Sequence, residues 1–236
     1  MKHRWDQRSG EPELMDLPDA DEIQLIATVR QFRTINQLVS RSRSLIRRHI
    51  LRDARRRGLR NITVLDVGAG GCDIGEWLVE AAPRYGVGAH VICLDQDPRI
   101  IAYARERTAR IPRIEVVEGP ADRIEELGEV DYIFANHFLH HLSDTEIVEL
   151  LPRIARAARF GFLLNDLRRS RFSYIGYSLL AGLFFRGSFA YYDGRLSIRR
   201  GFTEDELRRL IATAHQDRKA RVLSLTPGRL AVVAHY

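Results

Sequence analysis

Two carboxylates placed around a run of glycines are the first residues of this sequence that could do chemistry. Asp66 stands two positions before Gly68 in the run LDVGAGGCD, and Asp95 ends a second apolar run about 25 residues beyond Gly70. Glycine lets a backbone turn sharply and approach a ligand where a Cβ would collide. A carboxylate beside such a loop would repel a pyrophosphate but attract an ammonium group, and a second one can accept both hydroxyls of a ribose.

The same loop does not match the dinucleotide fingerprint G-x-G-x-x-G, because Asp73 stands where the third glycine belongs. LDVGAGGCD followed by ICLDQDP instead resembles motif I and the ribose-binding acidic motif of class I S-adenosylmethionine-dependent methyltransferases. The resemblance extends over roughly residues 60–236. It implies S-adenosylmethionine as cofactor and S-adenosylhomocysteine as product.

The resemblance also implies which residues bind the cofactor. Asp66 and the glycines would bind the methionine end, Asp95 the ribose and Gln96 the adenine. Cys72 and Pro120 depart from the family pattern, which commonly has Gly and Asp there. The full expected set of cofactor-binding residues is Asp66, Gly68, Ala69, Gly70, Asp95, Gln96, Ala121, Asp122 and Asn136.

The run DYIFANHFLHHL carries the next candidate chemistry. It lacks the NPPY or DPPY tetrad of enzymes that methylate base amines, and LHHL resembles the branch that methylates quinones, phenols and polyketides. A histidine can take the proton of a phenol at neutral pH. His140 and His141 are therefore the predicted bases, with helix-start packing as the alternative, and Asp166 is expected to reach the same crevice as a third catalytic residue.

No His or Cys spacing predicts a metal site, and two cysteines exclude a four-cysteine zinc site. The sequence therefore predicts no metal, with a catechol-type magnesium site through Asp166 and Asn165 as a remote alternative.

Alternating strand and helix patterns surround these residues and predict an α/β, Rossmann-like fold. The resemblance implies a doubly wound seven-stranded sheet, mostly parallel, with a C-terminal antiparallel hairpin. Thr226-Pro227-Gly228-Arg229 predicts the turn of that hairpin. Residues 1–58 are expected to form an N-terminal helical cap, broken near Ser40 to Ser44, and residues 59–236 the methyltransferase domain.

The segment from Phe172 to Tyr192 holds eight of the twenty aromatic residues of the chain. We expect residues 168–200 to form a helical lid packed against the N-terminal helices, whose apolar lining binds an aromatic acceptor. The predicted substrate-binding residues are Phe172, Tyr177, Phe184 and Tyr191. A dimer interface, core packing and peripheral membrane contact remain alternatives for the segment.

Charge is distributed unevenly along the chain. Residues 1–60 hold 14 basic and 8 acidic groups, residues 61–165 hold 10 and 17, and residues 166–236 hold 13 and 6. Basic ends could attract nucleic acid, yet all but two of the 37 basic residues are arginine, which indicates a genome-wide codon preference. Nucleic acid is thus a disfavoured partner, and the missing secretion signal predicts a cytoplasmic protein.

These features predict a methyltransferase that O-methylates a hydrophobic hydroxylated aromatic in secondary metabolism. DLRRS at 166–170 and GRLSIRRGFT at 194–203 resemble methyltransferases found with type III polyketide synthases. The alternatives are C-methylation of a quinone or polyketide, an RNA methyltransferase that uses the arginine-rich stretch 41–60, and a non-catalytic partner subunit that only binds the cofactor. A homodimer is also possible.

Overall fold

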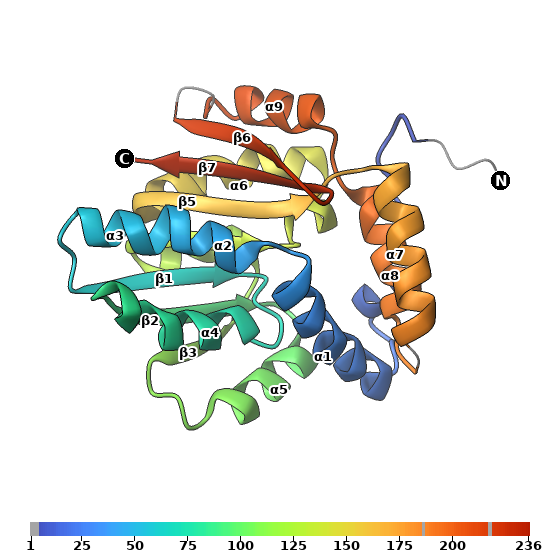
Figure 1. The fold of residues 1–236 in the computed structure, drawn as a ribbon, viewed down its shortest axis with the longest axis horizontal. Helices are drawn as coiled ribbons and strands as arrows, with labels where there is room; N and C mark the ends of the chain where they lie inside the picture. Colours follow the sequence, from blue (N-terminus) through green and yellow to red (C-terminus); the bar gives the residue numbers. More distant parts are fainter. Residues whose placement is uncertain (1–4, 186, 217–218) are drawn as a thin grey trace.

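A seven-stranded sheet forms the centre of the computed structural model, which describes residues 5–185, 187–216 and 219–236 (Figure 1). The strand order is β3-β2-β1-β4-β5-β7-β6. β7 runs opposite to the other six strands of this sheet, so the predicted fold class is confirmed. The strands are β1 (Asn61–Val67), β2 (Gly88–Asp95), β3 (Ile114–Glu118), β4 (Val130–Asn136), β5 (Ala158–Leu167), β6 (Ala220–Leu225) and β7 (Arg229–His235).

Both faces of this sheet are covered, which explains why its central strands read as nearly continuous apolar runs. Alternation along β1 sends Leu65 and Val67 into one apolar layer and Ile62 and Val64 into the other. The predicted hairpin is confirmed as well, because β6 and β7 pair from Ala220↔Ala234 to Leu225↔Arg229.

Helices cover the two faces in separate groups. On one face lie α2 (Ser42–Ile46), the π-helical turn η2 (Arg47–Leu51), α3 (Arg52–Arg56), α4 (Asp73–Ala81) and α5 (Pro98–Thr108). On the other lie α6 (Asp144–Ala157) and α9 (Glu204–Thr213). The short helices η3 (Ala82–Tyr85) and η4 (Ala121–Leu127) fill the connections. Among the described residues, no helix is both long enough and apolar enough to span a membrane.

A further group of helices lies beyond the carboxyl ends of the parallel strands, at the right of Figure 1. It comprises η1 (Leu14–Asp16), α1 (Glu22–Leu38), η5 (Leu139–His141), α7 (Arg171–Phe184) and α8 (Ala190–Arg200). α8 contacts α1, η1 and η5, whereas α7 packs on α8. The expected packing of the lid against the N-terminal helices is therefore made mainly by α8, with α7 on its outer side.

The N-terminal segment divides into two parts with different neighbours. α1 ends at Leu38 and α2 begins at Ser42, which confirms the predicted break. Leu45, Ile46 and Ile50 then pack in the same apolar cluster as β1 and α4. Residues 42–56 thus cover the sheet, whereas η1 and α1 lie over the carboxyl ends of the strands.

Candidate active site

A cavity of about 1430 Å³ opens at the carboxyl ends of the parallel strands. Its wall is formed by the loops after β1 to β4, by residues of α1, α7 and α8, and by the chain around η1. Ligands of open α/β sheets bind at this edge. Among the described residues, this cavity brings together most of the side chains that the sequence singled out.

The glycine loop after β1 forms one end of the cavity. Gly68 and Gly70 have φ angles of 67° and 54°, in the left-handed region that favours glycine. A Cβ on Gly68 would lie 2.6 Å from the ring of Phe138. The loop therefore requires glycine at this position, both for the turn and for the approach of the Phe138 ring.

Asp95 stands beside this loop and lines the cavity, as Gln96 does. The Gly70 amide donates to Asp95 Oδ2 over 2.8 Å, and the Asp97 amide donates to Oδ1 over 3.2 Å. Burial raises the pKa of Asp95 above its usual value, while these amide donors counteract the rise. The carboxylate is thus held in place at the position where a ribose diol would donate to it.

Asp66, which the family resemblance assigned to the methionine end of the cofactor, lies behind the glycine loop and not in the cavity wall. It is only 4% exposed and is absent from the cavity wall. Burial, followed by repulsion from Asp73 and Asp95, raises the pKa of Asp66 well above its usual range. Position 66 shares its side of β1 with Ile62 and Val64, which pack toward α4, so its carboxyl group points into that layer.

Asp73 lines the cavity instead, at the first position of α4. Asn36 of α1 donates to its Oδ1 over 3.2 Å. Sequence reasoning treated Asp73 only as a break in a glycine fingerprint. A carboxylate at this place is available to an ammonium group, which is the role that the sequence had assigned to Asp66.

Asparagines tie α1 to the ends of two strands. Asn136, at the end of β4, donates to Asn36 Oδ1 over 2.9 Å and accepts from Asn165 Nδ2 over 2.7 Å. Asn136 lines the cavity, as predicted, and so do Ala69, Ala121 and Asp122. Asn36 was missed because it lies within an ordinary amphipathic helix and its partners are remote in sequence.

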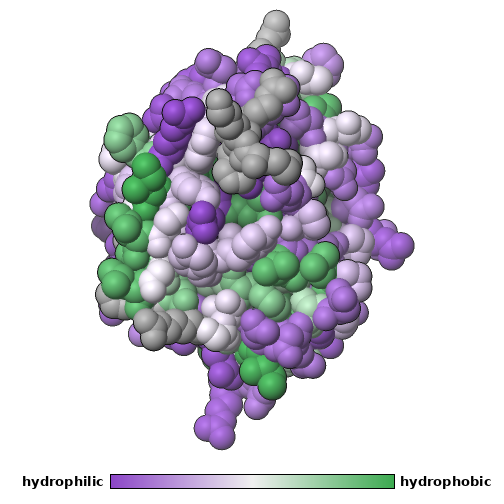
Figure 2. All heavy atoms as spheres, turned by 90° about the vertical axis from the view of Figure 1, so that its right-hand side faces the viewer, coloured by the Kyte–Doolittle hydropathy of each residue, from purple (hydrophilic) through white to green (hydrophobic). Residues whose placement is uncertain are grey.

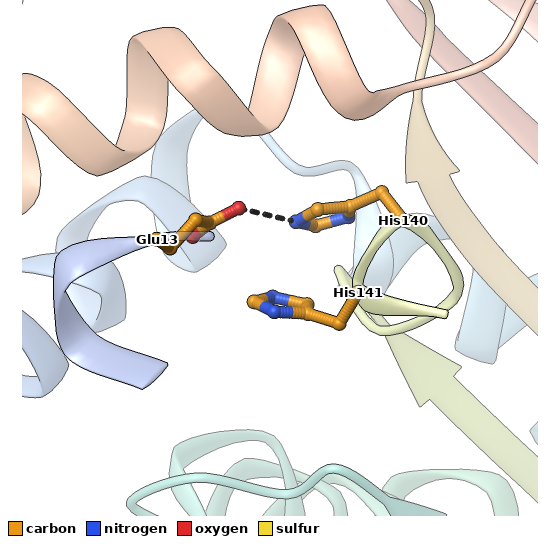
Figure 3. A group of neighbouring side chains, drawn as sticks. All are labelled: Glu13, His140 and His141. Atoms are coloured by element: carbon orange, nitrogen blue, oxygen red, sulfur yellow. Dashed lines mark ion pairs between the residues drawn. The ribbon is translucent and has the colours of Figure 1, made fainter. Parts of the chain in front are cut away.

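Glu13, His140 and His141 form the polar group at another part of the wall (Figure 3). His140 is 1% exposed, its Nδ1 lies 2.6 Å from Asp166 Oδ1, and its Nε2 lies 3.5 Å from Glu13 Oε1. Burial lowers the pKa of His140, but Asp166 and then Glu13 outweigh it and raise the pKa to about 9. His140 therefore holds its proton at neutral pH.

His141 has a different environment from its neighbour. Its Nδ1 pairs with Asp16 Oδ2 at 2.9 Å, and its ring lies 4.3 Å from that of His140, centre to centre. Figure 3 shows both rings extending toward Glu13. With Nδ1 fixed by Asp16, Nε2 of His141 is the nitrogen left to meet a ligand.

Asp166, expected to reach the crevice, is buried and does not line the cavity. Burial raises the pKa of Asp166, but the His140 ring outweighs it and holds the pKa below its usual range. The His140 amide also donates to Asp166 Oδ2 over 3.1 Å. Asp166 thus positions His140 instead of touching a ligand.

Glu13 is the most informative residue that sequence reasoning missed. Burial raises its pKa, but the rings of His141 and His140 and the Ser197 hydroxyl outweigh burial and hold the pKa at about 2. Its Oε1 accepts from Ser197 over 2.9 Å, while its Oε2 is buried without a hydrogen-bond partner. Each of Glu13, His140 and His141 offers a possible metal ligand, and these atoms lie within 4.8 Å of one another.

The lid residues are divided between the cavity and the surface. Phe172 and Tyr177 line the cavity, and the Tyr177 hydroxyl donates to the Ala190 carbonyl over 2.6 Å. Tyr191 does not line it, and its ring lies against the Arg195 guanidinium. The side chain of Phe184 falls outside the described part of the chain.

Comparisons with known proteins place this site in context. Residues 64–161 match the model of a methyltransferase domain family. No curated protein sequence matches the chain. Among solved structures, the plantazolicin methyltransferase BamL, crystallised with a desmethyl plantazolicin analogue and S-adenosylhomocysteine, is 13% identical with a TM-score of 0.64, over 91% of this chain and 95% of that one.

Two longer proteins share the fold as well. The pyocyanin biosynthetic protein PhzM is 16% identical over 94% of this chain, and human N-acetylserotonin methyltransferase is 18% identical over 96%, each with a TM-score of 0.60. This chain spans 60% and 63% of their respective lengths. Similarity at these identities establishes the fold.

Proposed function

Because residues 64–161 match a methyltransferase domain family and the chain has the fold of methyltransferases, we propose that this enzyme methylates a hydroxyl group of a hydrophobic aromatic small molecule. The methyl donor is S-adenosylmethionine. A phenolic, polyketide or quinone-like acceptor of secondary metabolism fits the site best. The pyocyanin biosynthetic protein PhzM and the plantazolicin methyltransferase BamL share the fold.

The residues around the glycine loop fit this donor. The donor carries a ribose, an ammonium group and a positively charged sulfonium, and three carboxylates lie in or behind this end of the wall: Asp66, Asp73 and Asp95. Gly68 and Gly70 let the backbone approach it closely. Asp95 would accept the ribose hydroxyls, and Asp73 would accept the ammonium group.

One observation carries the proposal: a single cavity joins the glycine loop to the Glu13, His140 and His141 group. Its volume of about 1430 Å³ exceeds that of ordinary small-ligand pockets, so it has room for a donor and an acceptor together. Apolar side chains of α1 and α7 line it as well, including Val29, Phe32, Ile35, Phe172 and Leu180. An apolar wall with one polar group suits a lipophilic molecule with a reactive hydroxyl.

S-adenosylmethionine, when bound, supplies a methyl group on a sulfonium that leaves as a neutral thioether. The protein must align the acceptor hydroxyl and accept its proton while the oxygen–carbon bond forms. His141 accepts that proton at Nε2, and Asp16 at Nδ1 fixes the tautomer and stabilises the charged ring. His140 keeps its own proton and orients Glu13, so its role is to position rather than to act as a base.

Arginines hold this machinery together from α8 and from the N-terminal segment. Arg200 Nε donates to the His140 carbonyl over 3.0 Å, and its Nη2 donates to the His141 carbonyl over 2.9 Å. Arg8 Nη2 reaches the His140 carbonyl over 3.2 Å. These bonds fix η5 from two elements that are distant in sequence, which keeps both rings at the cavity.

Calorimetry followed by a transfer assay tests the proposal. We expect micromolar binding of S-adenosylmethionine and S-adenosylhomocysteine to the purified chain, no binding of NAD, and transfer of a labelled methyl group to an alkylated phenol. Binding without transfer to phenols, quinones or RNA would favour a partner subunit. Transfer to carbon or to RNA would overturn the assigned acceptor class.

A further inference from the structure

Helix α7 presents a row of apolar side chains to solvent. Phe172, Ile175, Leu179 and Leu183 are all exposed, Phe172 to 90% and Leu183 to 72%. Steps of three and four residues place them along one side of the helix, and we call them the α7 stripe. Figure 2 shows apolar side chains gathered over α7, at the left of that view. Large contiguous apolar surfaces of this kind mark sites of interaction.

The α7 stripe continues into the cavity. Phe172, at its beginning, lines the cavity, and so do Gly176 and Leu180 on the adjoining side of the helix. Ile175, Leu179 and Leu183 face away from the cavity wall. An apolar molecule bound at the stripe would therefore reach the site along one helix, by way of Phe172.

Positive charge lies at the start of the same helix. Arg168 and Arg171 are exposed there. Arg41 reaches the same corner, because its Nη1 donates to the Thr226 carbonyl over 2.6 Å and the Arg168 amide donates to the Gly228 carbonyl in the same turn. An apolar helix face bordered by arginines fits a surface of anionic lipid.

The sequence from 167 to 192 contains no acidic residue. If a second copy of the chain docked on the stripe through its own α7, the arginines of the two segments would face each other. Neither segment would supply a carboxylate to pair with them. Lipid phosphates supply the missing negative charge. The charge pattern favours a bilayer over a second copy.

We propose that the α7 stripe docks this enzyme on an anionic lipid bilayer, from which the hydrophobic acceptor enters the cavity. The helix, with 14 residues, lies in the plane of the interface, with its apolar side among the acyl chains and its arginines at the headgroups. The acceptor's route rests on the proposed function. The docking itself does not, because it needs only the surface of α7.

Co-sedimentation with vesicles tests the docking. Untagged protein comprising residues 1–236 is mixed with vesicles of phosphatidylcholine alone and with vesicles that also contain phosphatidylglycerol. We expect binding to the anionic vesicles, and a loss of about tenfold in the partition coefficient for the variant Ile175→Gln, Leu179→Gln, Leu183→Gln. Ile23→Gln is the matched control, because Ile23 is an 81% exposed apolar side chain on α1, outside the stripe.

Further variants test the contribution of positive charge to vesicle binding and the alternative that the stripe binds a second copy of the chain. Arg41→Gln combined with Arg171→Gln should weaken binding to the anionic vesicles, whereas Arg123→Gln, on η4 and outside the stripe, should not. Equal sedimentation of the stripe variant and wild type would overturn the proposal, as would absence of vesicle binding. A wild-type dimer that the stripe variant turns into monomer, with no vesicle binding, would assign the surface to a second copy.

The stripe variant also separates docking from catalysis. Circular dichroism and calorimetry with S-adenosylmethionine show whether it is folded and binds the donor. We expect it to methylate a water-soluble phenol as wild type does, and to lose methylation of an alkylated phenol presented in vesicles. If no phenol is methylated by either protein, the proposed function fails while the vesicle assay still decides the docking.

Discussion

His140 and Asp166 are joined twice, once through the ring and once through the backbone. Nδ1 of His140 lies 2.6 Å from Asp166 Oδ1, and the His140 amide donates to Oδ2 over 3.1 Å. Both side chains are 1% exposed. One carboxylate at the end of β5 thus fixes both the position of η5 and the charge of the ring that it carries.

This pair should make stability depend on pH. Because the folded pKa of His140 is raised from 6.5 to about 9, its contribution is complete below pH 6.5 and is lost as the pH rises through 9. The free energy of unfolding should therefore fall by up to about 3 kcal/mol across that window. Urea titrations at several pH values measure it.

Asp166→Asn is the variant that checks the origin of this dependence. Leaving one partner of a buried pair unmatched costs about 3 kcal/mol, so the variant should be less stable at pH 6. Its stability should also change less between pH 6.5 and 9 than that of wild type. A variant that keeps the full dependence would show that another group titrates in this range.

Exchanging His141 for Ala should slow methyl transfer without preventing donor binding. Loss of a positioned base costs about a hundredfold or more in kcat, while KM should change little. Asp16→Asn should produce a smaller loss, because the ring remains but its orientation is no longer fixed. Single-turnover transfer measures both. His90→Ala, an exposed histidine on β2, is the control.

An unchanged rate in the His141 variant would remove the base assignment. A bell-shaped or sigmoidal pH profile in wild type that disappears in His141→Ala would support it. His140→Gln provides a further comparison, because it removes the charged neighbour but leaves the Asp16 and His141 pair in place. We expect this variant to lose stability as well as rate.

Asp66, Asp73 and Asp95 should differ in their importance for the donor. Asp73→Asn and Asp95→Asn change carboxylates that line the cavity, so each should weaken S-adenosylmethionine binding about tenfold or more. Asp66→Asn should bind within about threefold of wild type, because the carboxyl group is buried outside the wall and burial disfavours its charge. Calorimetry at neutral pH compares the three.

The opposite order would restore the role that the family resemblance implied. If Asp66→Asn abolished binding while Asp73→Asn did not, the ammonium group would depend on Asp66, and its carboxyl group would have to turn toward the cavity in the complex. Thermal unfolding without donor separates this result from simple loss of fold.

Local patterns predicted the sheet, the glycine loop and the hairpin because each has a signature within a few residues. Gly68 and Gly70 adopt left-handed backbone angles in the loop where the sequence predicted a sharp turn. The number of strands follows from the family resemblance and not from the spacing. Contacts between distant segments had no such signature.

Glu13 and Asp16 illustrate this limit. They precede the first amphipathic helix in a stretch with no periodicity, and only the packing of η1 against α8 and η5 brings them to the two histidines. Tyr191 was predicted to bind the substrate but does not line the cavity. A segment rich in aromatic residues predicts a pocket, but it does not show which side of the helix faces that pocket. Successive side chains of a strand point to opposite faces of the sheet, so the position of Asp66 in β1 directs its side chain to the same face as Ile62 and Val64.

The group of Glu13, His140 and His141 should not depend on a metal ion. A metal ion at these atoms would need an unprotonated Nε2 on His140, yet Asp166 and Glu13 hold the ring's pKa at about 9. At pH 7 the protonated His140 ring would thus outnumber the unprotonated ring about a hundredfold, and a metal ion would have to displace that proton. We expect dialysis against a chelator to leave the transfer rate unchanged. A rate that falls with the chelator and returns with zinc or manganese, in wild type but not in Glu13→Gln, would replace His141 as the base by a metal-bound hydroxyl.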